Sequence, residues 1–229
     1  MSSPLKHAAL VLLACIALAG CSSPADSDDG QPADGSSDGS SAAPEGGDEG
    51  SNVTINGNDA LTWGDGPYGV VLAHGSAFDA ASWQDQATEI ADTGVTVVAV
   101  EDISPEAIQD AVTYLQDDGI DDVALVGGSA GADAILDLAS DEPDLPDQLI
   151  LLSPNSTVDG LGEEPKLFIA SEDEPVANVS TELAQTAPGS DNEATLLPGS
   201  AHAQNIFDTD QGQPVLDAIL ERVQKFADS

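Results

Sequence analysis

From residue 52 to the end of the chain, short continuous hydrophobic runs alternate with segments whose hydrophobic positions recur at helical spacing. The continuous runs predict strands covered on both faces, namely residues 69–73, 95–100, 123–126, 148–152, 166–170 and 194–197. The predicted helices are residues 82–92, 105–115, 130–139, 177–185 and 214–227, and residues 53–55 and 60–63 fit two antiparallel edge strands. This alternation predicts an α/β fold with a mostly parallel sheet flanked by helices.

The strand predicted at residues 123–126 leads directly into Gly127-Gly128-Ser129-Ala130-Gly131, which has the form Gly-x-Ser-x-Gly. Glycines in such a segment let the backbone turn sharply between a strand and a helix, which lifts the serine hydroxyl to the edge of the sheet. In open α/β sheets the functional crevice lies at the carboxyl ends of the strands. The pattern therefore predicts that Ser129 is a nucleophile.

Other reactive side chains also come directly after predicted strands. They are His74 of a His-Gly pair, after residues 69–73; the acids at 172–174, after residues 166–170; and His202, after residues 194–197. Together with the Gly-x-Ser-x-Gly elbow and the chain order Ser, acid, His, these features resemble the α/β-hydrolase superfamily, and in particular its serine esterases. The resemblance covers about residues 61–228 and implies the α/β-hydrolase fold with a catalytic triad.

In that triad, the resemblance implies that Ser129 attacks the substrate and His202 removes its proton, while a carboxylate orients the imidazole. His74 is the only other histidine beyond residue 51, and the resemblance implies a structural role for it. We predict Asp173 as the acid, because it follows Ala170 by three residues, as in the family pattern. A frame shifted by one residue makes Glu174 the acid instead, and Glu172 ranks third.

An oxyanion hole is also implied by the resemblance. Its donors would be the backbone N–H groups of Ala130, next after the nucleophile, and of Ser76, just after the His-Gly pair. Ala77 is the close alternative for the second donor. No cofactor is expected. No metal site is expected either, because the acidic segment at 208–212 lacks the closing Glu of a calcium loop.

The stretch between Leu152 and Lys166 is too short for a cap domain, so we expect a compact fold with a shallow, open pocket. The implied function is that of a serine hydrolase, which cleaves a carboxylic ester or related acyl bond of a small molecule through an acyl-enzyme intermediate. Two alternatives stay open. One is a peptidase or amidase of the same fold, and the other is a non-catalytic, hydrolase-like binding lipoprotein.

The start of the chain predicts a location. Residues 1–20 carry Lys6 and then an apolar run that is too short to span a bilayer comfortably, as in a secretory signal peptide. Leu18-Ala19-Gly20-Cys21 resembles the lipobox of prokaryotic lipoproteins, which implies a lipid on Cys21 and an anchor on the extracytoplasmic face of the cell membrane. An ordinary cleaved signal peptide is the alternative. Residues 21–51 predict a disordered acidic linker, and 52–229 the hydrolase domain.

Charge excludes one class of partner. The chain has 42 acidic residues and 4 basic ones, for a formal net charge of −38. Nucleic acid is excluded, because phosphate binding needs clustered Lys and Arg. Anionic substrates are expected to be repelled over long range. We expect a monomer.

Overall fold

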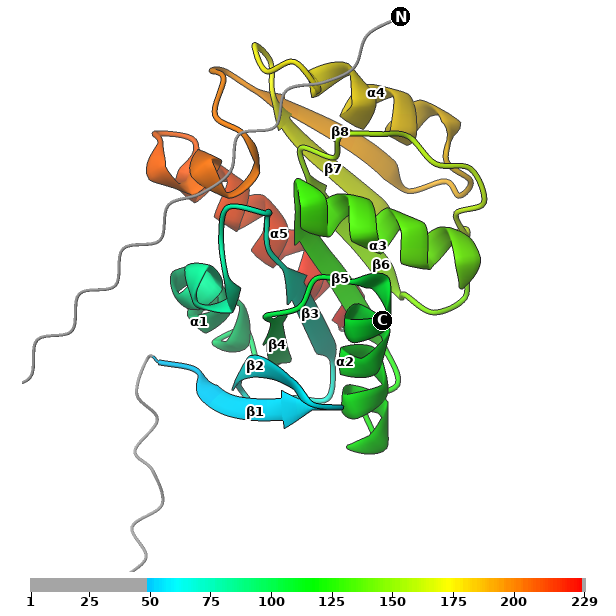
Figure 1. Cartoon of the computed structure of the whole chain (residues 1–229). Coiled ribbons are helices and arrows are strands. Elements are labelled where there is room, and N and C mark those ends of the chain that lie inside the picture. The colour runs from blue at the N-terminus through cyan, green and yellow to red at the C-terminus, as the bar shows by residue number, and fades with distance from the viewer. Residues whose placement is uncertain (1–48, 228–229) are drawn as a thin grey trace, which may run out of the picture. The chain divides into compact units, whose positions relative to one another are not determined.

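The computed structural model describes residues 49–227, which form an open sheet of eight strands in the order β1-β2-β4-β3-β5-β6-β7-β8 (Figure 1). The strands are β1 (Ser51–Ile55), β2 (Asn58–Trp63), β3 (Gly69–Ala73), β4 (Thr96–Val100), β5 (Val123–Gly128), β6 (Gln148–Leu152), β7 (Lys166–Ser171) and β8 (Asn192–Leu197). From β4 to β8 every neighbouring pair is parallel, whereas β1 pairs with β2 and β2 with β4 in antiparallel fashion. The predicted fold class is confirmed.

Helices cover both faces of this sheet (Figure 1). They are α1 (Gln84–Ala91), α2 (Pro105–Asp117), α3 (Ala130–Asp141), α4 (Ala177–Thr186) and α5 (Gly212–Ala227), with short 3-10 turns η1 (Ala80–Trp83) and η2 (Ala203–Asp208). The start of α2 shows why the sequence predicts a helix there. The Ser104 side chain accepts a hydrogen bond from the Ala107 N–H, and Pro105 has the backbone angle that a first helical residue needs.

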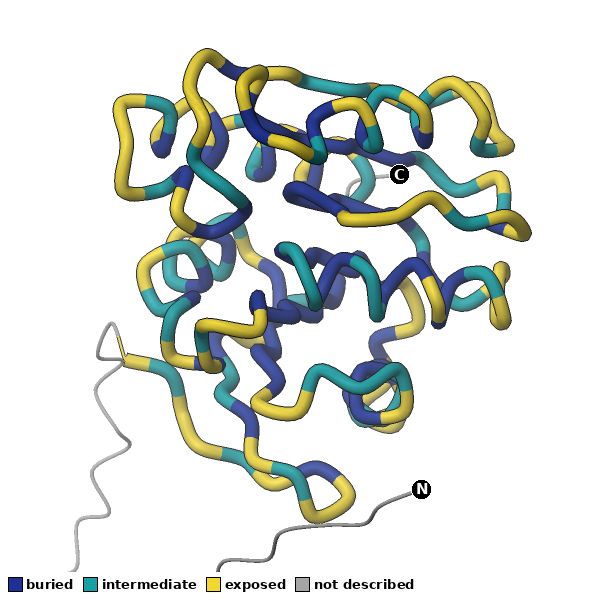
Figure 2. The backbone as a smooth tube through the Cα atoms, turned by 45° about the horizontal axis from the view of Figure 1, so that its top comes forward, coloured by how far each residue is buried: buried dark blue, intermediate teal, exposed yellow. Residues whose placement is uncertain are grey.

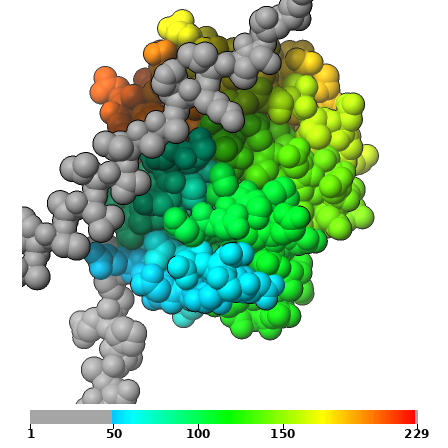
Figure 3. All heavy atoms as spheres, viewed as in Figure 1, coloured from blue at the N-terminus to red at the C-terminus, as the bar shows by residue number. Residues whose placement is uncertain are grey.

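Two hydrophobic layers hold the sheet between its helices. Because side chains alternate along a strand, Leu125 packs toward α2, α3 and α4, while its neighbour Val126 packs toward α1 and α5. Both are fully buried, and the central strands run through the interior of the molecule (Figure 2). The β1–β2 hairpin packs beside α2 at one edge (Figure 3).

The connection from β6 to β7 contains no helix. Consecutive parallel strands in such sheets are usually joined by a crossover helix, which this connection lacks, and it is also too short for a cap domain. Lys166 holds the end of this connection. Its buried Nζ donates to the carbonyl oxygens of Gly162, Glu164 and Pro188 at 2.8, 2.6 and 3.1 Å.

Among the helices of residues 49–227, none has the length and apolar character needed to cross a bilayer. The signal peptide predicted at residues 1–20, the lipidation predicted at Cys21 and nearly all of the predicted linker lie outside the described residues.

Candidate active site

Ser129 occupies a sharp turn between β5 and α3. Its backbone has φ 51° and ψ −112°, a conformation that residues with a side chain rarely adopt. The turn depends on its glycines, because a Cβ on Gly131 would overlap the carbonyl oxygens of Ala73 and His74. The sequence therefore folds here into the elbow that the motif predicts, with the Ser129 side chain at the carboxyl edge of the sheet.

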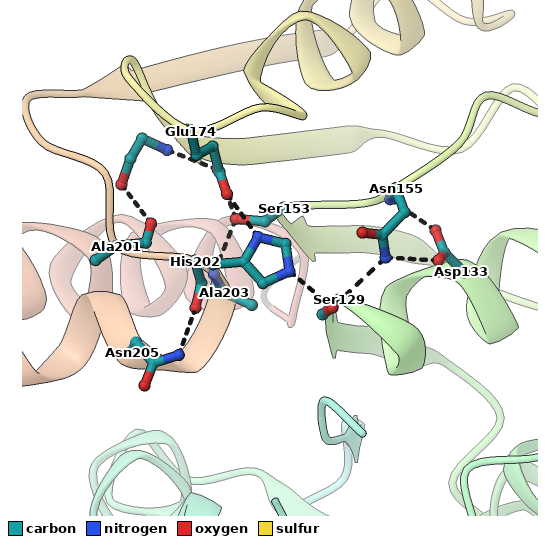
Figure 4. A network of polar contacts seen from close by, with 10 residues as sticks. Ser129, Asp133, Ser153, Asn155, Glu174, Ala201, His202, Ala203 and Asn205 are labelled. Carbon is teal, nitrogen blue, oxygen red and sulfur yellow. Dashed lines mark hydrogen bonds and ion pairs between the residues drawn. The ribbon is translucent and has the colours of Figure 1, made fainter. Parts of the chain in front are cut away.

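His202 reaches this edge from the loop after β8. Its Nε2 atom lies 2.8 Å from Ser129 Oγ, and its Nδ1 atom lies 2.6 Å from Glu174 Oε2 (Figure 4). A carboxylate can only accept hydrogen bonds, so Nδ1 carries the ring proton and Nε2 is left as the acceptor for the Ser129 O–H. The structure thus brings together the two residues predicted as nucleophile and base.

The acid beside His202 is Glu174, and the prediction of Asp173 is wrong for this contact. Strand β7 continues one residue beyond the predicted end, to Ser171, and the next residues turn back so that the Glu174 N–H donates to the Ser171 carbonyl at 3.3 Å. This turn directs Glu174 inward and leaves Asp173 exposed, with its backbone N–H bonded to the Gly199 carbonyl at 2.9 Å. Glu172 is exposed as well.

Buried donors hold the Glu174 carboxylate in place. Its Oε1 atom accepts from Ser153 Oγ at 2.7 Å and from the Ser171 N–H at 2.9 Å, which leaves Oε2 for His202. Ser153 also accepts from the Ala203 N–H at 2.9 Å, so one hydroxyl links the Glu174 carboxylate to the loop that carries His202. No sequence motif predicts Ser153, whose only signal is that it is a polar residue directly after a buried strand.

The segment predicted to supply the second oxyanion donor also lies against the elbow. A Cβ added to Gly75 would lie 3.5 Å from Ser129 Cβ, and Ser76 is the next residue. The Gly75 N–H itself is engaged, because it donates to Gln204 Oε1 at 2.7 Å. The Ser76 donor, and Ala77 as its alternative, stay predictions.

Ala130, the other predicted donor, is the first residue of α3. Backbone N–H groups in the first turn of a helix have no partner within the helix and carry partial positive charge. They therefore suit an oxyanion. The role of Ala130 stays a prediction.

His74 lies in the same region but makes no contact with Ser129 that would suit a base. Its Nδ1 atom lies 2.8 Å from the Gly75 carbonyl and its Nε2 atom 3.0 Å from the Glu101 carbonyl. Both ring nitrogens are thus occupied by backbone oxygens. This arrangement fits the structural role that the resemblance implies.

A second pair of polar residues, which the sequence motifs do not predict, adjoins Ser129. Asn155 Nδ2 lies 3.5 Å from Ser129 Oγ and 2.7 Å from Asp133 Oδ2 (Figure 4). Asn155 follows β6 by three residues and Asp133 is in the first turn of α3. No sequence motif joins these two positions, since only the folded loop brings them together.

Basic side chains within residues 49–227 lie away from Ser129. Lys166 begins β7 at the opposite end of the strands, and burial lowers its pKa. Arg222 and Lys225, both on α5, bind Asp191 at 3.1 and 2.6 Å, and the hydrogen bond from Lys225 lowers the pKa of the Asp191 carboxyl. Among residues 49–227, the surroundings of the elbow therefore carry acids such as Asp133 without compensating Lys or Arg side chains.

Metal ligation finds no support in the same part of the chain: across residues 49–227, no three His, Cys, Asp or Glu side chains are grouped so that they could hold an ion.

The sequence matches no protein-family model and no curated protein. Solved structures do resemble it. An esterase of the bacterial hormone-sensitive lipase family has a TM-score of 0.65 at 16% identity, over 81% of this chain and 87% of that one. A predicted CIB-like hydrolase from Thermoplasma acidophilum has a TM-score of 0.63 at 17% identity, over 77% and 98%. A monoacylglycerol lipase from Paleococcus ferrophilus has a TM-score of 0.61 at 14% identity, over 73% and 98%.

These likenesses identify the fold of the chain as the α/β-hydrolase fold. At such low identity they define the architecture and leave the chemistry to be argued from the side chains. A shared fold hosts many functions, so that argument must come from the site itself.

Proposed function

We propose that the protein is a serine hydrolase that cleaves carboxylic esters through an acyl-enzyme intermediate. One observation carries this proposal: Ser129 Oγ, the His202 imidazole and the Glu174 carboxylate form a continuous hydrogen-bonded chain, with contacts of 2.8 and 2.6 Å. A serine hydroxyl is a weak nucleophile until a neighbouring base removes its proton, and this chain supplies the base and the group that orients it.

The reaction follows from the direction of these bonds. Ser129 transfers its proton to His202 Nε2 as Oγ bonds to the substrate carbonyl carbon, and Glu174 stabilises the imidazolium that results. The carbonyl oxygen takes up the negative charge, for which the Ala130 and Ser76 N–H groups are the proposed donors. His202 then protonates the leaving alcohol, and water repeats the sequence to release the acid.

Several features favour small or exposed acyl substrates. The His202 side chain is 37% exposed, and no helix follows β6 to cover the site. The acids near the elbow favour neutral or cationic molecules over anionic ones. Esters are the preferred class because the solved structures of similar fold include esterases and a lipase.

A peptidase or amidase of the same fold is the second enzymatic reading, and a binding module without activity is the third. A binding module has no need of a serine and an imidazole in hydrogen-bond contact, so the pair favours an enzyme.

For the location of the protein we propose a lipid anchor at Cys21 on the extracytoplasmic side of the membrane, on the strength of the lipobox-like residues.

The test is turnover of short p-nitrophenyl esters. We expect Ser129→Ala and His202→Ala each to lower kcat by about 10⁴- to 10⁶-fold while the domain stays folded. The matched control is Ser190→Ala, an exposed serine ahead of β8. Ester turnover that survives both active-site substitutions would overturn the proposal, as would a wild-type protein with no activity on esters, amides or peptides.

A further inference from the structure

One polar side chain reaches the nucleophile from outside the Ser129–His202–Glu174 chain. Asn155 lies in the loop after β6, with its Nδ2 atom 3.5 Å from Ser129 Oγ. Figure 4 shows the Asn155 amide and the His202 imidazole approaching Ser129 from different sides. The hydroxyl therefore has one neighbour that can take its proton and a second that can donate to its oxygen.

The orientation of the Asn155 amide is fixed by Asp133. The Asp133 carboxylate accepts from the Asn155 backbone N–H at 2.8 Å and from its Nδ2 at 2.7 Å. A carboxylate has no proton to donate, so the amide must turn its nitrogen, and not its oxygen, toward Asp133. Because Nδ2 carries two hydrogens, the second one is available for Ser129 Oγ.

Asp133 is in turn fixed relative to the nucleophile. It belongs to the first turn of α3, and its backbone N–H donates to the Ser129 carbonyl at 3.0 Å. Asp133 is only partly exposed, whereas Asn155 lies in an exposed loop that the carboxylate fastens to the helix. The pair thus connects the loop after β6 to the elbow through two hydrogen bonds.

We propose that Asn155, held by Asp133, is a hydrogen-bond donor to the attacking oxygen. This inference rests on the proposed hydrolase function and adds a residue to it. In the resting state Ser129 donates its proton to His202 and accepts from Asn155, so that two bonds select one rotamer of the hydroxyl. A fixed nucleophile lies closer to the attack geometry than a rotating one.

The same donor acts in the second half of the reaction. When water has added to the acyl-enzyme, the bond between the acyl carbon and Oγ breaks and its electron pair returns to Oγ, which recovers a proton from His202. Negative charge grows on Oγ during this step, and a donor in place stabilises it. Hydrogen bonds in an unliganded site are often long and tighten as charge develops, and the 3.5 Å separation is compatible with such a bond.

The experiment compares kcat, KM and the rate of inactivation by a fluorophosphonate probe for wild type, Asn155→Ala, Asn155→Asp and Asp133→Asn. Asn155→Ala removes the donor without adding charge, whereas Asn155→Asp keeps the size of the side chain and replaces the donor with a carboxylate that also repels Asp133. Asn178→Ala, an exposed asparagine on α4, is the matched control. Circular dichroism and Tm check that each variant is folded.

We expect both Asn155 variants to lower kcat and the inactivation rate by about 10- to 100-fold, with KM changed by less than about 3-fold. Asp133→Asn should act in the same direction, and its combination with Asn155→Ala should be less than additive, because both remove one interaction. A merely structural role would lower Tm without this split between kcat and KM.

The result that overturns the inference is a wild-type enzyme that turns over esters and reacts with the probe, together with Asn155→Ala and Asn155→Asp variants that match it within about twofold. That result leaves the proposed function standing. Failure of the function itself is distinguishable, because Ser129→Ala would then behave like wild type.

Discussion

Replacing Glu174 by Gln tests the assignment of the acid, and the structure predicts which way the new amide will face. In the native site, Oε1 accepts from Ser153 Oγ at 2.7 Å and from the Ser171 N–H at 2.9 Å. A glutamine must keep its carbonyl oxygen toward these two donors. Its NH₂ group then faces His202 Nδ1, where Oε2 now lies at 2.6 Å.

An amide N–H at that position reverses the hydrogen bond. His202 Nδ1 would have to accept, so the ring proton would move to Nε2, which could no longer take the proton of Ser129. In serine proteases the equivalent change from carboxylate to amide lowers kcat by about 10⁴-fold through the wrong tautomer. We expect Glu174→Gln to lower kcat by about 10³- to 10⁴-fold, with a small change in KM.

The assay is steady-state hydrolysis of p-nitrophenyl acetate or butyrate, with Asp173→Asn as the matched control one residue away. Asp173 is exposed and only its backbone is engaged, so its variant should keep activity within about twofold. A large loss in Asp173→Asn with little loss in Glu174→Gln would refute the reasoning, because the acid would then be the residue that the structure turns outward.

Two further predictions concern the support of the site and its charge. Ser153→Ala removes a buried donor from Glu174 and leaves the Ala203 N–H without its acceptor. We therefore expect the free energy of unfolding to fall by about 1–3 kcal/mol. Thermal unfolding, with the exposed Ser156→Ala as control, measures this loss, and an unchanged Tm would contradict it. A cationic choline-type ester should have a higher kcat/KM than an anionic ester of the same acyl group at low salt, and the ratio should fall as salt shortens the Debye length to about 10 Å at 0.1 M. A ratio that does not change with ionic strength would show that the acids do not steer substrates.

The sequence predicts the sheet, the elbow and the base, because each has a local pattern. A continuous apolar run predicts a buried strand, and the glycines around Ser129 predict the turn, since any Cβ on Gly131 would overlap backbone atoms at the end of β3. His202 is predicted as the base because it comes after the last predicted strand and because the chain has few histidines.

The sequence predicts Asp173 and not Glu174 beside His202, because the carboxylate that makes this contact depends on a single residue of strand length. Whether β7 ends at Ala170 or Ser171 decides which of two neighbouring carboxylates turns inward, and the inward carboxylate is held by Ser153, which lies in the loop after β6. The contact between Asn155 and Asp133 also depends on tertiary packing and has no local sequence pattern. Each residue is unremarkable in the sequence, and only the packing of a loop against α3 joins them.

The most direct measurement is mass spectrometry of the intact protein and its peptides after treatment with a fluorophosphonate probe. The account predicts one adduct, located on Ser129, which is absent in Ser129→Ala and forms far more slowly in His202→Ala and Glu174→Gln. An unmodified Ser129 in folded protein, or an adduct at equal rate in the His202 variant, would contradict the claim that the imidazole activates this hydroxyl.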